Sequence, residues 1–333
     1  MLTEAPIDIS PEMDVHLRQV VRALQDGRLV FFLGAGANLC DRRDGWTWNQ
    51  VQRESLPNGS ELATYLAETF HLEPTGDLAK VAQHVELQEE SGPLYDTLQS
   101  LFDADWPITS LHRLLAGIPA ILRAKKYPHT QDSLRRRLLF VTTNFDDLLE
   151  RALGAAGESF HLVVYQAEGE HKGRFLHQAP TGDVTVVESA NDYRGLFADE
   201  HPIVLKIHGG VNRTGTGHGS FVITEDHYIE YLVRKESVAS LLPAPIPSLL
   251  TDRNLLFLGY ALRDWNLRVI LYRLWEDSNL AWKSWAIQRS TDLLEALFWE
   301  RRAVKIMPFS LGDYVPLLAE RLRELPSAEV KPT

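Results

Sequence analysis

Three short polar segments contain residue types that could do chemistry, and each begins at the end of an apolar run. They are segment 34–38 (GAGAN), segment 142–146 (TTNFD) and segment 206–210 (KIHGG). Glycines let a backbone approach a phosphate closely, the amide of Asn144 can hold a sugar hydroxyl or a water, and the imidazole of His208 can accept a proton. These segments are therefore the candidate site for a reaction on a phosphorylated sugar.

Segment 34–38 is expected to form a tight turn after a buried strand. Gly34 and Gly36 allow the backbone to turn sharply and to present its N–H groups to a phosphate. The segment is not a full G-x-G-x-x-G dinucleotide-binding pattern, because Leu39 stands where the third glycine belongs and no acidic residue follows on a clear second strand. A plain turn from a strand into a helix is the alternative.

Segment 142–146 supplies an amide in Asn144 and a carboxylate in Asp146. The carboxylate could hold the loop in place or support positive charge on a substrate. The alternative interpretation gives this segment a structural role, in which Thr142 or Thr143 caps the helix that follows. Both interpretations place the segment at the carboxyl end of a strand, where open α/β sheets bind their ligands.

His208 is the one histidine of twelve whose position suggests chemistry, since it directly follows a predicted buried strand. A histidine packed in the core or exposed on the surface is the alternative. A fourth segment, 258–268 (LGYALRDWNLR), has Gly259 at a strand end and Asp264 in a position to cap a helix. Its polar groups could reach an adenosine; alternatively, it is only the start of a helix.

The elements that must position these segments are short apolar strands. Apolar runs that are too short for helices and end in glycine or polar residues indicate strands buried on both faces. Such runs occupy residues 29–33, 138–142, 203–207, 255–258, 284–287 and 303–306. Helix-period segments separate them, so we predict a doubly wound, Rossmann-like α/β fold with a parallel sheet. This fold brings all four segments to one edge of the sheet.

The remaining sequence predicts helices and loops around that sheet. We expect a helix from Ser10 to about Gly27, an α-helical insertion over about 50–137 and an amphipathic helix over 314–325. Residues 167–200 are expected to form a long loop or a small excursion over the sheet face. The insertion is expected to contain helices at 60–70, 78–90 and 94–102. We therefore expect one domain over residues 1–320 and a flexible tail over 326–333.

The composition is that of a folded protein without a basic footprint. Of 333 residues 44% are hydrophobic, and 34 basic against 45 acidic residues give a net charge of −11, which argues against binding to nucleic acid or anionic membranes. The single cysteine, Cys40, allows no internal disulfide and no zinc site with two thiolates. No apolar stretch is long enough to span a membrane and no signal peptide is evident, so we expect a cytoplasmic protein.

A local basic cluster is the exception to the acidic balance. It contains Arg123, Lys125, Lys126 and residues 135–137, opposed by Asp132, with a net charge of +5. The cluster could meet an acidic partner or nucleic acid. A solvated helix face is the alternative, and we do not expect direct binding to nucleic acid.

Together the segments resemble the sirtuin-like family, and specifically its bacterial NAD-hydrolysing branch. The resemblance rests on GAGAN at 34–38, TTNFD at 142–146, KIHG at 206–209, FVITEDHY at 221–228 and FLGYALRDWN at 257–266. Their order and spacing match the family over about residues 15–310. In that family the glycine loop binds the NAD diphosphate, the asparagine holds the nicotinamide ribose or the attacking water, and the histidine acts as the base.

The resemblance implies that NAD is the substrate and assigns residue roles. Catalytic roles fall on Asn144, Asp146 and His208, and NAD-binding roles on Gly34, Ala35, Gly36, Asn38, Thr143, Gly209, Gly259 and Tyr260. Nicotinamide leaves as a neutral molecule and needs no general acid, unlike the leaving group of an ordinary glycoside. Hydrolysis would give nicotinamide and ADP-ribose, whereas attack by the adenine nitrogen would give cyclic ADP-ribose.

Three departures from the family pattern weaken protein deacylation and leave NAD binding intact. The deacylases carry four zinc-binding cysteines, which one cysteine cannot replace, so we expect neither zinc nor another metal. Thr143 stands where they have glutamine, and segment 45–48 (GWTW) replaces their Ile-Pro-Asp-Phe-Arg continuation. NAD-dependent deacylation remains one alternative function, and a sensor that binds NAD or ADP-ribose without turnover is another.

The resemblance also implies a biological setting. Related proteins act as effectors of bacterial antiphage defence, where destruction of NAD must be controlled. We expect this chain to form a homo-oligomer or to need an activating partner, such as a HerA-type hexameric ATPase.

Overall fold

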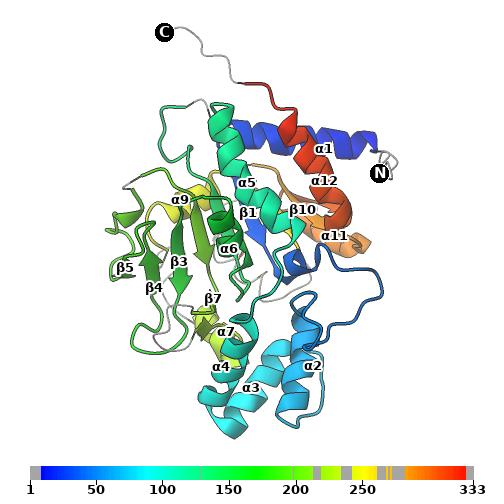
Figure 1. Ribbon diagram of the computed structural model, residues 1–333, viewed down its shortest axis with the longest axis vertical. Helices are drawn as coiled ribbons and strands as arrows, with labels where there is room; N and C mark the ends of the chain where they lie inside the picture. The colour runs from blue at the N-terminus through cyan, green and yellow to red at the C-terminus, as the bar shows by residue number, and fades with distance from the viewer. Residues whose placement is uncertain are drawn as a thin grey trace.

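The protein has a central nine-stranded sheet with helices on both faces (Figure 1). The computed structural model describes residues 9–128, 130–197, 199–212, 219–233, 242–260, 268, 271 and 282–327. The strand order is β11-β10-β9-β1-β2-β6-β3-β4-β5, in which the seven strands from β11 to β3 run parallel. The doubly wound, Rossmann-like α/β fold is therefore confirmed.

Six of the seven parallel strands, all except β3, match the apolar runs predicted from the sequence. The seven strands are β1 (Leu29–Leu33), β2 (Leu139–Thr142), β3 (His161–Tyr165), β6 (Ile203–Lys206), β9 (Asn254–Leu258), β10 (Ser284–Gln288) and β11 (Val304–Pro308). Every residue of β1, β2, β6 and β9 is buried, because helices cover both faces of the sheet. The chain enters the sheet at β1, in the middle, and later elements extend it on both sides.

The expectation of a long loop or a small excursion over the sheet face at 167–200 is wrong. This region contains β4 (Phe175–Gln178) and β5 (Val184–Val187), which extend the sheet from β3 in antiparallel order. The strand β3 was also missing from the predicted set. In β3 and β4, buried residues alternate with partly exposed ones, and β5 is largely exposed, so these strands lack the complete burial of β1, β2, β6 and β9.

Ten α-helices are described. They are α1 (Pro11–Gln25), α2 (Gly59–Thr69), α3 (Leu78–Glu89), α4 (Ser91–Phe102), α5 (Ser110–Ala124), α6 (Leu148–Ala155), α7 (Glu225–Val233), α9 (Ile246–Thr251), α11 (Leu293–Glu300) and α12 (Leu311–Arg323). The Ser10 hydroxyl accepts a hydrogen bond from the Met13 amide at 3.2 Å, as expected for the first helix. The last helix begins three residues before the predicted start, because Ser310 caps it.

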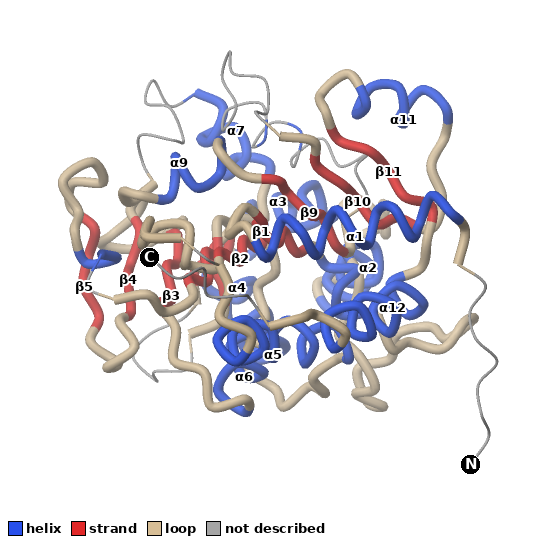
Figure 2. The backbone as a smooth tube through the Cα atoms, turned by 90° about the horizontal axis from the view of Figure 1, so that it is seen from above, coloured by secondary structure: helices blue, strands red, loops and turns tan. Residues whose placement is uncertain are grey.

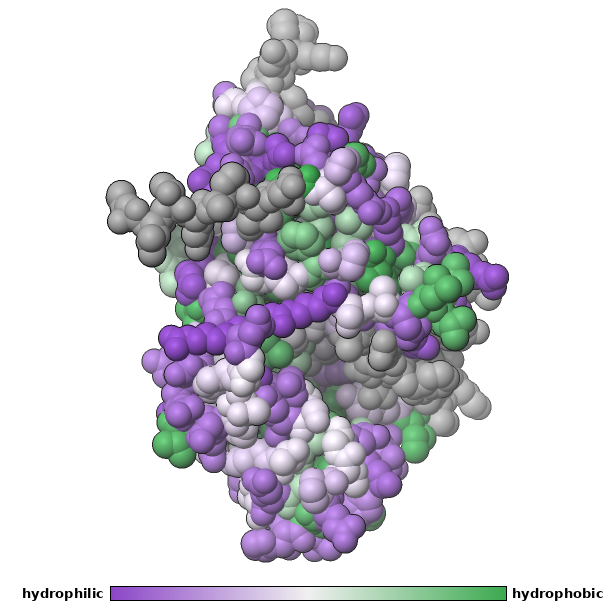
Figure 3. Space-filling view, turned by 90° about the vertical axis from the view of Figure 1, so that its right-hand side faces the viewer, coloured by the Kyte–Doolittle hydropathy of each residue, from purple (hydrophilic) through white to green (hydrophobic). Residues whose placement is uncertain are grey.

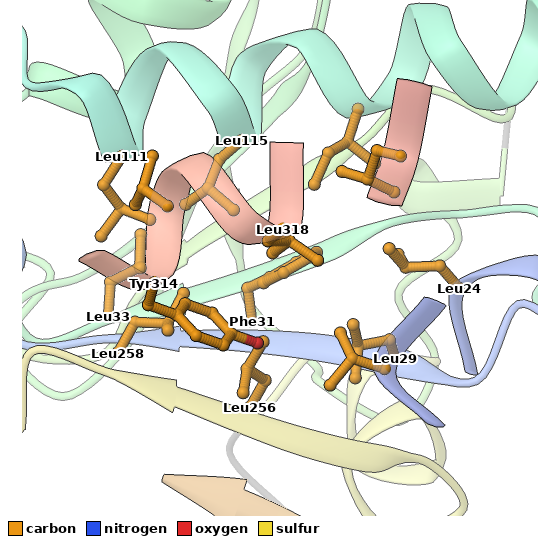
Figure 4. Close-up of a cluster of buried hydrophobic side chains, with 14 of the residues drawn as sticks. Leu24, Leu29, Phe31, Leu33, Leu111, Leu115, Leu256, Leu258, Tyr314 and Leu318 are labelled. Carbon is orange, nitrogen blue, oxygen red and sulfur yellow. The ribbon is translucent and has the colours of Figure 1, made fainter. Parts of the chain in front are cut away.

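Two hydrophobic cores lie on opposite faces of the sheet. On one face α1, α5, α6 and α12 pack against the odd-numbered side chains of β1, and Figure 4 shows Phe31 and Leu33 beneath Tyr314 and Leu318. On the other face α9 and Trp299 of α11 pack against residues such as Phe32. Figure 2 shows α9 and α11 on one side of the strands and α5, α6 and α12 on the other.

The helices α2, α3 and α4 form a separate unit with a core of its own (Figure 1). This core includes Trp106 and Phe102, and it also receives Phe145 and Phe221 from the loops at the sheet edge. In contrast, α5 packs on the sheet with α6 and α12. The expected helical insertion over 50–137 therefore divides into helices that cover the strand ends and one helix that covers the sheet face.

Some sequence-based expectations lie outside the described residues. Asp264 belongs to the undescribed segment 261–267, and residues 328–333 contain most of the expected tail. Among the helices that the structure describes, none has both the length and the apolar composition that a membrane span requires.

The basic cluster near α5 is largely engaged in ion pairs. Arg123 pairs with Glu158 at 2.5 Å, and Arg136 pairs with Glu200 at 2.5 Å. Arg137 is buried and its carbonyl accepts a hydrogen bond from Arg253 at 2.8 Å. These contacts reduce the positive charge that the cluster presents to a partner.

The buried histidine of α1 should make the fold sensitive to acid. His16 is hydrogen-bonded to Tyr314 at 3.0 Å, and burial lowers its pKa from 6.5 to about 4. Between these values the unfolded chain binds a proton that the folded chain does not, so stability is lost as the pH falls below 6.5. From pH 7 to pH 5 this loss should be roughly 1.5 kcal/mol.

Denaturant unfolding at pH 7 and pH 5 tests this expectation. His16→Gln should be less stable at pH 7 but should lose less stability on acidification than the wild-type chain. His84 is exposed, so His84→Gln should keep the wild-type pH dependence. Equal acid losses in wild type and His16→Gln would contradict the role given to His16.

Candidate active site

The predicted segments meet around one cavity at the carboxyl ends of the parallel strands. The cavity has a volume of about 790 Å³ and is lined by Ala35, Gly36, Asn38, Thr143, Asn144, Asp146, His208, Gly259 and Tyr260. Side chains of α2, α3 and α4 line its other side, among them Leu62 and Phe102. Figure 3 shows a hollow between the sheet-bearing part of the molecule and the part formed by α2–α4. Gly34 and Gly209 lie behind this lining and shape the backbone.

The glycine segment packs directly on the loop that follows β9. The segment forms a short 3₁₀ helix, η1 (Ala35–Leu39), immediately after β1. A Cβ on Gly36 would lie 2.7 Å from the Gly259 carbonyl oxygen, and a Cβ on Gly34 would lie 2.9 Å from the Tyr260 ring. Gly259 has a φ of +76°, and a Cβ there would overlap the backbone nitrogen of Ala37. The three glycines thus allow two loops to touch through their backbones.

This packing uses two backbone donors of the glycine segment. The Gly34 N–H donates to the Leu258 carbonyl at 3.0 Å, and the Gly36 N–H donates to the Gly259 carbonyl at 2.8 Å. These two groups are therefore engaged within the fold. A bound phosphate would need other donors of the loop.

Asn144 is held by its neighbours at the end of β2. Its backbone N–H donates to the Thr142 hydroxyl at 2.9 Å, and its side-chain Nδ2 donates to the Gly34 carbonyl at 3.2 Å. The Thr143 hydroxyl is hydrogen-bonded to the Tyr260 hydroxyl at 2.7 Å. Neither threonine caps α6, because Asp147 occupies the cap position and Asp146 accepts from the Leu148 amide at 3.1 Å.

Asp146 connects the β2 loop to the glycine segment. Its Oδ2 accepts a hydrogen bond from Asn38 Nδ2 at 2.7 Å, and both residues are buried. The Oδ1 atoms of Asn38 and Asn144 are also buried, and neither accepts a hydrogen bond from any residue that the structure describes. Buried polar atoms are normally hydrogen-bonded. These two oxygens therefore indicate where a bound molecule or water would donate hydrogen bonds.

His208 follows β6 and is only 5% exposed. Burial, with a smaller contribution from His227, lowers its pKa from 6.5 to about 3, so the imidazole is neutral at physiological pH. Its ring contacts the Tyr228 ring edge-on, with centroids 5.6 Å apart, and both residues line the cavity. A neutral imidazole can accept a proton, whereas an imidazolium cannot.

The backbone around His208 forms a small hairpin, β7 (Gly209–Gly210) with β8 (Ser220–Phe221). Gly209 has a φ of +75°, and a Cβ there would overlap the Ser220 carbonyl oxygen. The Val222 N–H donates to the His208 carbonyl at 2.9 Å. The hairpin therefore fixes His208 through its own backbone and requires glycine beside it.

The helical unit holds this hairpin in place. Gln99 of α4 donates to the Asn212 carbonyl at 2.8 Å and accepts from the Gly219 amide at 2.9 Å, so it bridges the two ends of segment 213–218. Gln83 of α3 makes two hydrogen bonds with Asp226, at 2.9 and 3.1 Å. The Phe221 ring contacts three aromatic rings, those of Tyr95, Phe102 and Phe145. Gln83, Gln99 and Tyr228 are not among the predicted site residues. Only Tyr228 lies in a segment that carries the family resemblance, FVITEDHY at 221–228.

Segment 45–48 (GWTW) and the preceding Arg42 are fixed to α2. Arg42 makes two hydrogen bonds with the Glu61 carboxylate, at 2.8 and 2.9 Å, and its guanidinium lies 4.8 Å from the Trp46 ring centroid. The Trp48 amide donates to the same carboxylate at 3.1 Å. Trp46 lines the cavity. An Arg–Glu pair therefore positions this wall of the site.

One cluster near the site contains residue types that bind metals, but its histidine nitrogen that faces the carboxylate is protonated. It consists of Glu86, Glu168 and His227. The Nδ1 of His227 accepts from the Ile223 and Thr224 amides, at 3.2 and 3.3 Å, which places the ring proton on Nε2. This Nε2 faces Glu168 at 3.3 Å. A protonated nitrogen has no lone pair for a metal, so this arrangement suits a hydrogen bond better.

Comparison with known families decides the classification. The family model described as "SIR2-like domain" matches residues 138–307, just over half of the 333-residue chain. The chain belongs to the SIR2-like family. The matched region of this SIR2-like chain contains Asn144, His208 and Gly259.

Two curated relatives share the SIR2-like sequence at low identity. Defense-associated sirtuin 2 of Bacillus subtilis is 21% identical over 257 residues, which cover 77% of this chain and 20% of the relative. NAD(+) hydrolase ThsA of Cytobacillus dafuensis is 22% identical over 269 residues, which cover 80% of this chain and 42% of the relative. The SIR2-like chain therefore spans less than half the length of either relative.

Substitution of Gly259 should separate the close packing of the loops from simple backbone strain. Gly169 has nearly the same φ, +78° against +76°, but a Cβ on Gly169 would meet nothing within 4 Å. Gly169→Ala should lose only about 1 kcal/mol of unfolding free energy. Gly259→Ala should lose more than about 3 kcal/mol, because the new methyl group overlaps Ala37. Denaturant unfolding measures both losses, and similar values would contradict the packing argument.

Proposed function

We propose that this SIR2-like chain hydrolyses NAD⁺ to nicotinamide and ADP-ribose and acts as an NAD-depleting effector in antiphage defence. The observation that carries the proposal is a single cavity that combines a neutral histidine, His208, with buried amide oxygens of Asn38 and Asn144. The similarity to a relative named NAD(+) hydrolase ThsA supports this reaction, and the similarity to Defense-associated sirtuin 2 supports the role in defence.

The residues present suit a cationic substrate with ribose hydroxyls. The Oδ1 atoms of Asn38 and Asn144 can accept hydrogen bonds from hydroxyls or from water. The buried carboxylate of Asp146 lies beside them and can stabilise positive charge on the sugar. Nicotinamide departs neutral, so the bond can break without a general acid, and the positive charge passes to the ribose as an oxocarbenium ion.

Water then attacks the oxocarbenium carbon, with Asn144 as the group that orients it. The attack forms a C–O bond and makes the incoming water strongly acidic. Even a weak base such as buried His208, with a pKa of about 3, can accept the released proton. The proton later passes to solvent, so NAD⁺ and water give nicotinamide, ADP-ribose and one proton.

Control of the activity is part of the proposal. We infer that self-assembly, or a partner such as a HerA-type hexameric ATPase, switches the hydrolase on. The aligned region covers only 20% and 42% of the two relatives, so the rest of those proteins could contain control elements of a different kind. Assays with the isolated chain and with lysate from infected bacteria distinguish intrinsic from triggered activity.

Substitutions at His208 and Asn144 test the reaction. His208→Ala and Asn144→Ala should each lower nicotinamide release by at least about 100-fold, because proton acceptance and water orientation are lost. His84→Ala, on the exposed face of α3, is the matched control and should keep wild-type activity. Chromatography follows nicotinamide, ADP-ribose and cyclic ADP-ribose, and circular dichroism checks the fold of each variant.

The outcomes separate the competing functions. NAD binding without nicotinamide release, alone and with lysate, would favour a sensor. Transfer of an acyl group from a peptide would favour deacylation. An active His208→Ala protein would contradict the role of His208 as the base.

The pH dependence of the reaction tests the buried state of His208. The base must be neutral, and a pKa of about 3 keeps it neutral from pH 8 down to about pH 5. As the pH falls from 8 to about 5, kcat/KM should therefore show no loss due to this group. An acid limb with its midpoint near the ordinary histidine pKa of 6.5, in protein shown to remain folded, would contradict a buried His208.

A further inference from the structure

A buried lysine lies directly beneath the loop that carries Asn144 and Asp146. Lys206, the last residue of β6, is 2% exposed. Its Nζ donates to the backbone carbonyl of Asp146 and lies 2.9 Å from Glu150 Oε1 of α6. The lysine thus joins the carboxyl end of β6 to the turn between β2 and α6.

Stability does not explain this arrangement well. Burial of two charges costs solvation free energy, and apolar residues of similar size often replace such pairs without loss of stability. Burial raises the pKa of the Glu150 carboxyl, and the ammonium group of Lys206 acts in the opposite direction. The contact that an apolar side chain could not replace is the hydrogen bond to the Asp146 carbonyl.

The second glycine after His208 makes room for this lysine. A Cβ on Gly210 would overlap Cε of Lys206 and would lie 3.0 Å from both Nζ and the Phe145 carbonyl oxygen. The Val211 N–H donates to that same Phe145 carbonyl at 2.8 Å. Segment 206–210 (KIHGG) therefore contacts the loop that follows β2 through Lys206, and it also places His208 at the cavity.

We propose that Lys206 is a positioning residue, whose ammonium group, clamped by Glu150, fixes the 143–147 loop so that Asn144 and Asp146 keep their places relative to His208. The proposal rests on the proposed NAD hydrolysis for its effect on rate. Asp146 is then held at three points: its carbonyl by Lys206, and its carboxylate by Asn38 and by the Leu148 amide. Displacement of this residue would carry Asn144 with it, since only Phe145 separates the two residues.

The test removes both charges at once. In Lys206→Met/Glu150→Leu, kcat for nicotinamide release should fall by about tenfold or more, whereas KM should change less than about threefold. Hydrogen exchange of the 143–148 amides should become faster, and thermal stability should stay close to that of the wild type. Unchanged kcat and unchanged exchange in the folded double variant would overturn the proposal.

A second pair in the same helical layer supplies the control. Arg123 and Glu158 also form an ion pair with one buried partner, but neither residue lines the cavity. Arg123→Met/Glu158→Leu should leave kcat and the exchange of the 143–148 amides unchanged. An equal effect of both double variants would mean that loss of any ion pair in this layer loosens the loop, and would overturn the specific role of Lys206.

A second variant, Glu150→Gln, tests the proposal by the exchange of the same backbone amides. If the first double variant does not fold, Glu150→Gln keeps the lysine but removes its anionic clamp, and the same amides should exchange faster than in wild type. Exchange of these amides does not depend on turnover. A wild-type chain that releases no nicotinamide, either alone or with lysate from infected bacteria, would defeat the proposed function, while faster exchange in the variants would still support Lys206 as the residue that holds the loop.

Discussion

The close approach of two backbones, at the ends of β1 and β9, is the constraint on which the site depends. Gly36 and Gly259 are in contact at a point where any larger residue would clash. The Gly36 N–H donates a hydrogen bond to the Gly259 carbonyl at 2.8 Å. Because β1 and β9 pair in parallel from Leu29 to Leu33, the sheet brings these glycines together in a fixed register. The β2 loop joins the same arrangement through the bond from Asn144 to the Gly34 carbonyl. Hydrogen bonds between the loops that follow β1, β2 and β9 therefore hold this wall of the cavity together.

The site is polar but protected from solvent, and this combination sets its chemistry. Asn38, Asn144, Asp146 and His208 are all buried. Burial keeps His208 uncharged, so no imidazolium would repel a cationic ligand in the cavity. Burial also strengthens the interaction between the Asp146 carboxylate and any positive charge that develops nearby. A solvent-exposed copy of the same residues would have neither property.

Sequence reasoning identified the elements that are buried on both faces, because their apolar runs are continuous. It missed β3, in which His161 precedes four apolar residues, and the short strands β4 and β5, which contain polar residues such as His177. These two histidines are hydrogen-bonded to each other at 2.8 Å inside the antiparallel extension, a pairing that no local pattern reveals. The glycines of segment 34–38 were found, but for a phosphate contact rather than for the packing against Gly259 that the structure shows. Gln83 and Gln99 could not be found, since an amide on a helix acquires a role only when the hairpin of His208 folds against it.

The pairing of β1 with β9 also determines when the cavity can form. Leu29 pairs with Asn254, so the two central strands are separated by most of the chain. During synthesis β1 is made long before β9 and cannot pair with it until β9 is complete. Contacts between such distant residues form late in folding. A nascent chain that still lacks residues 254–260 has no wall against which the glycine segment can pack. The cavity is thus completed only after β9 has been synthesised, and ribosome-bound fragments ending before β9 cannot assemble it.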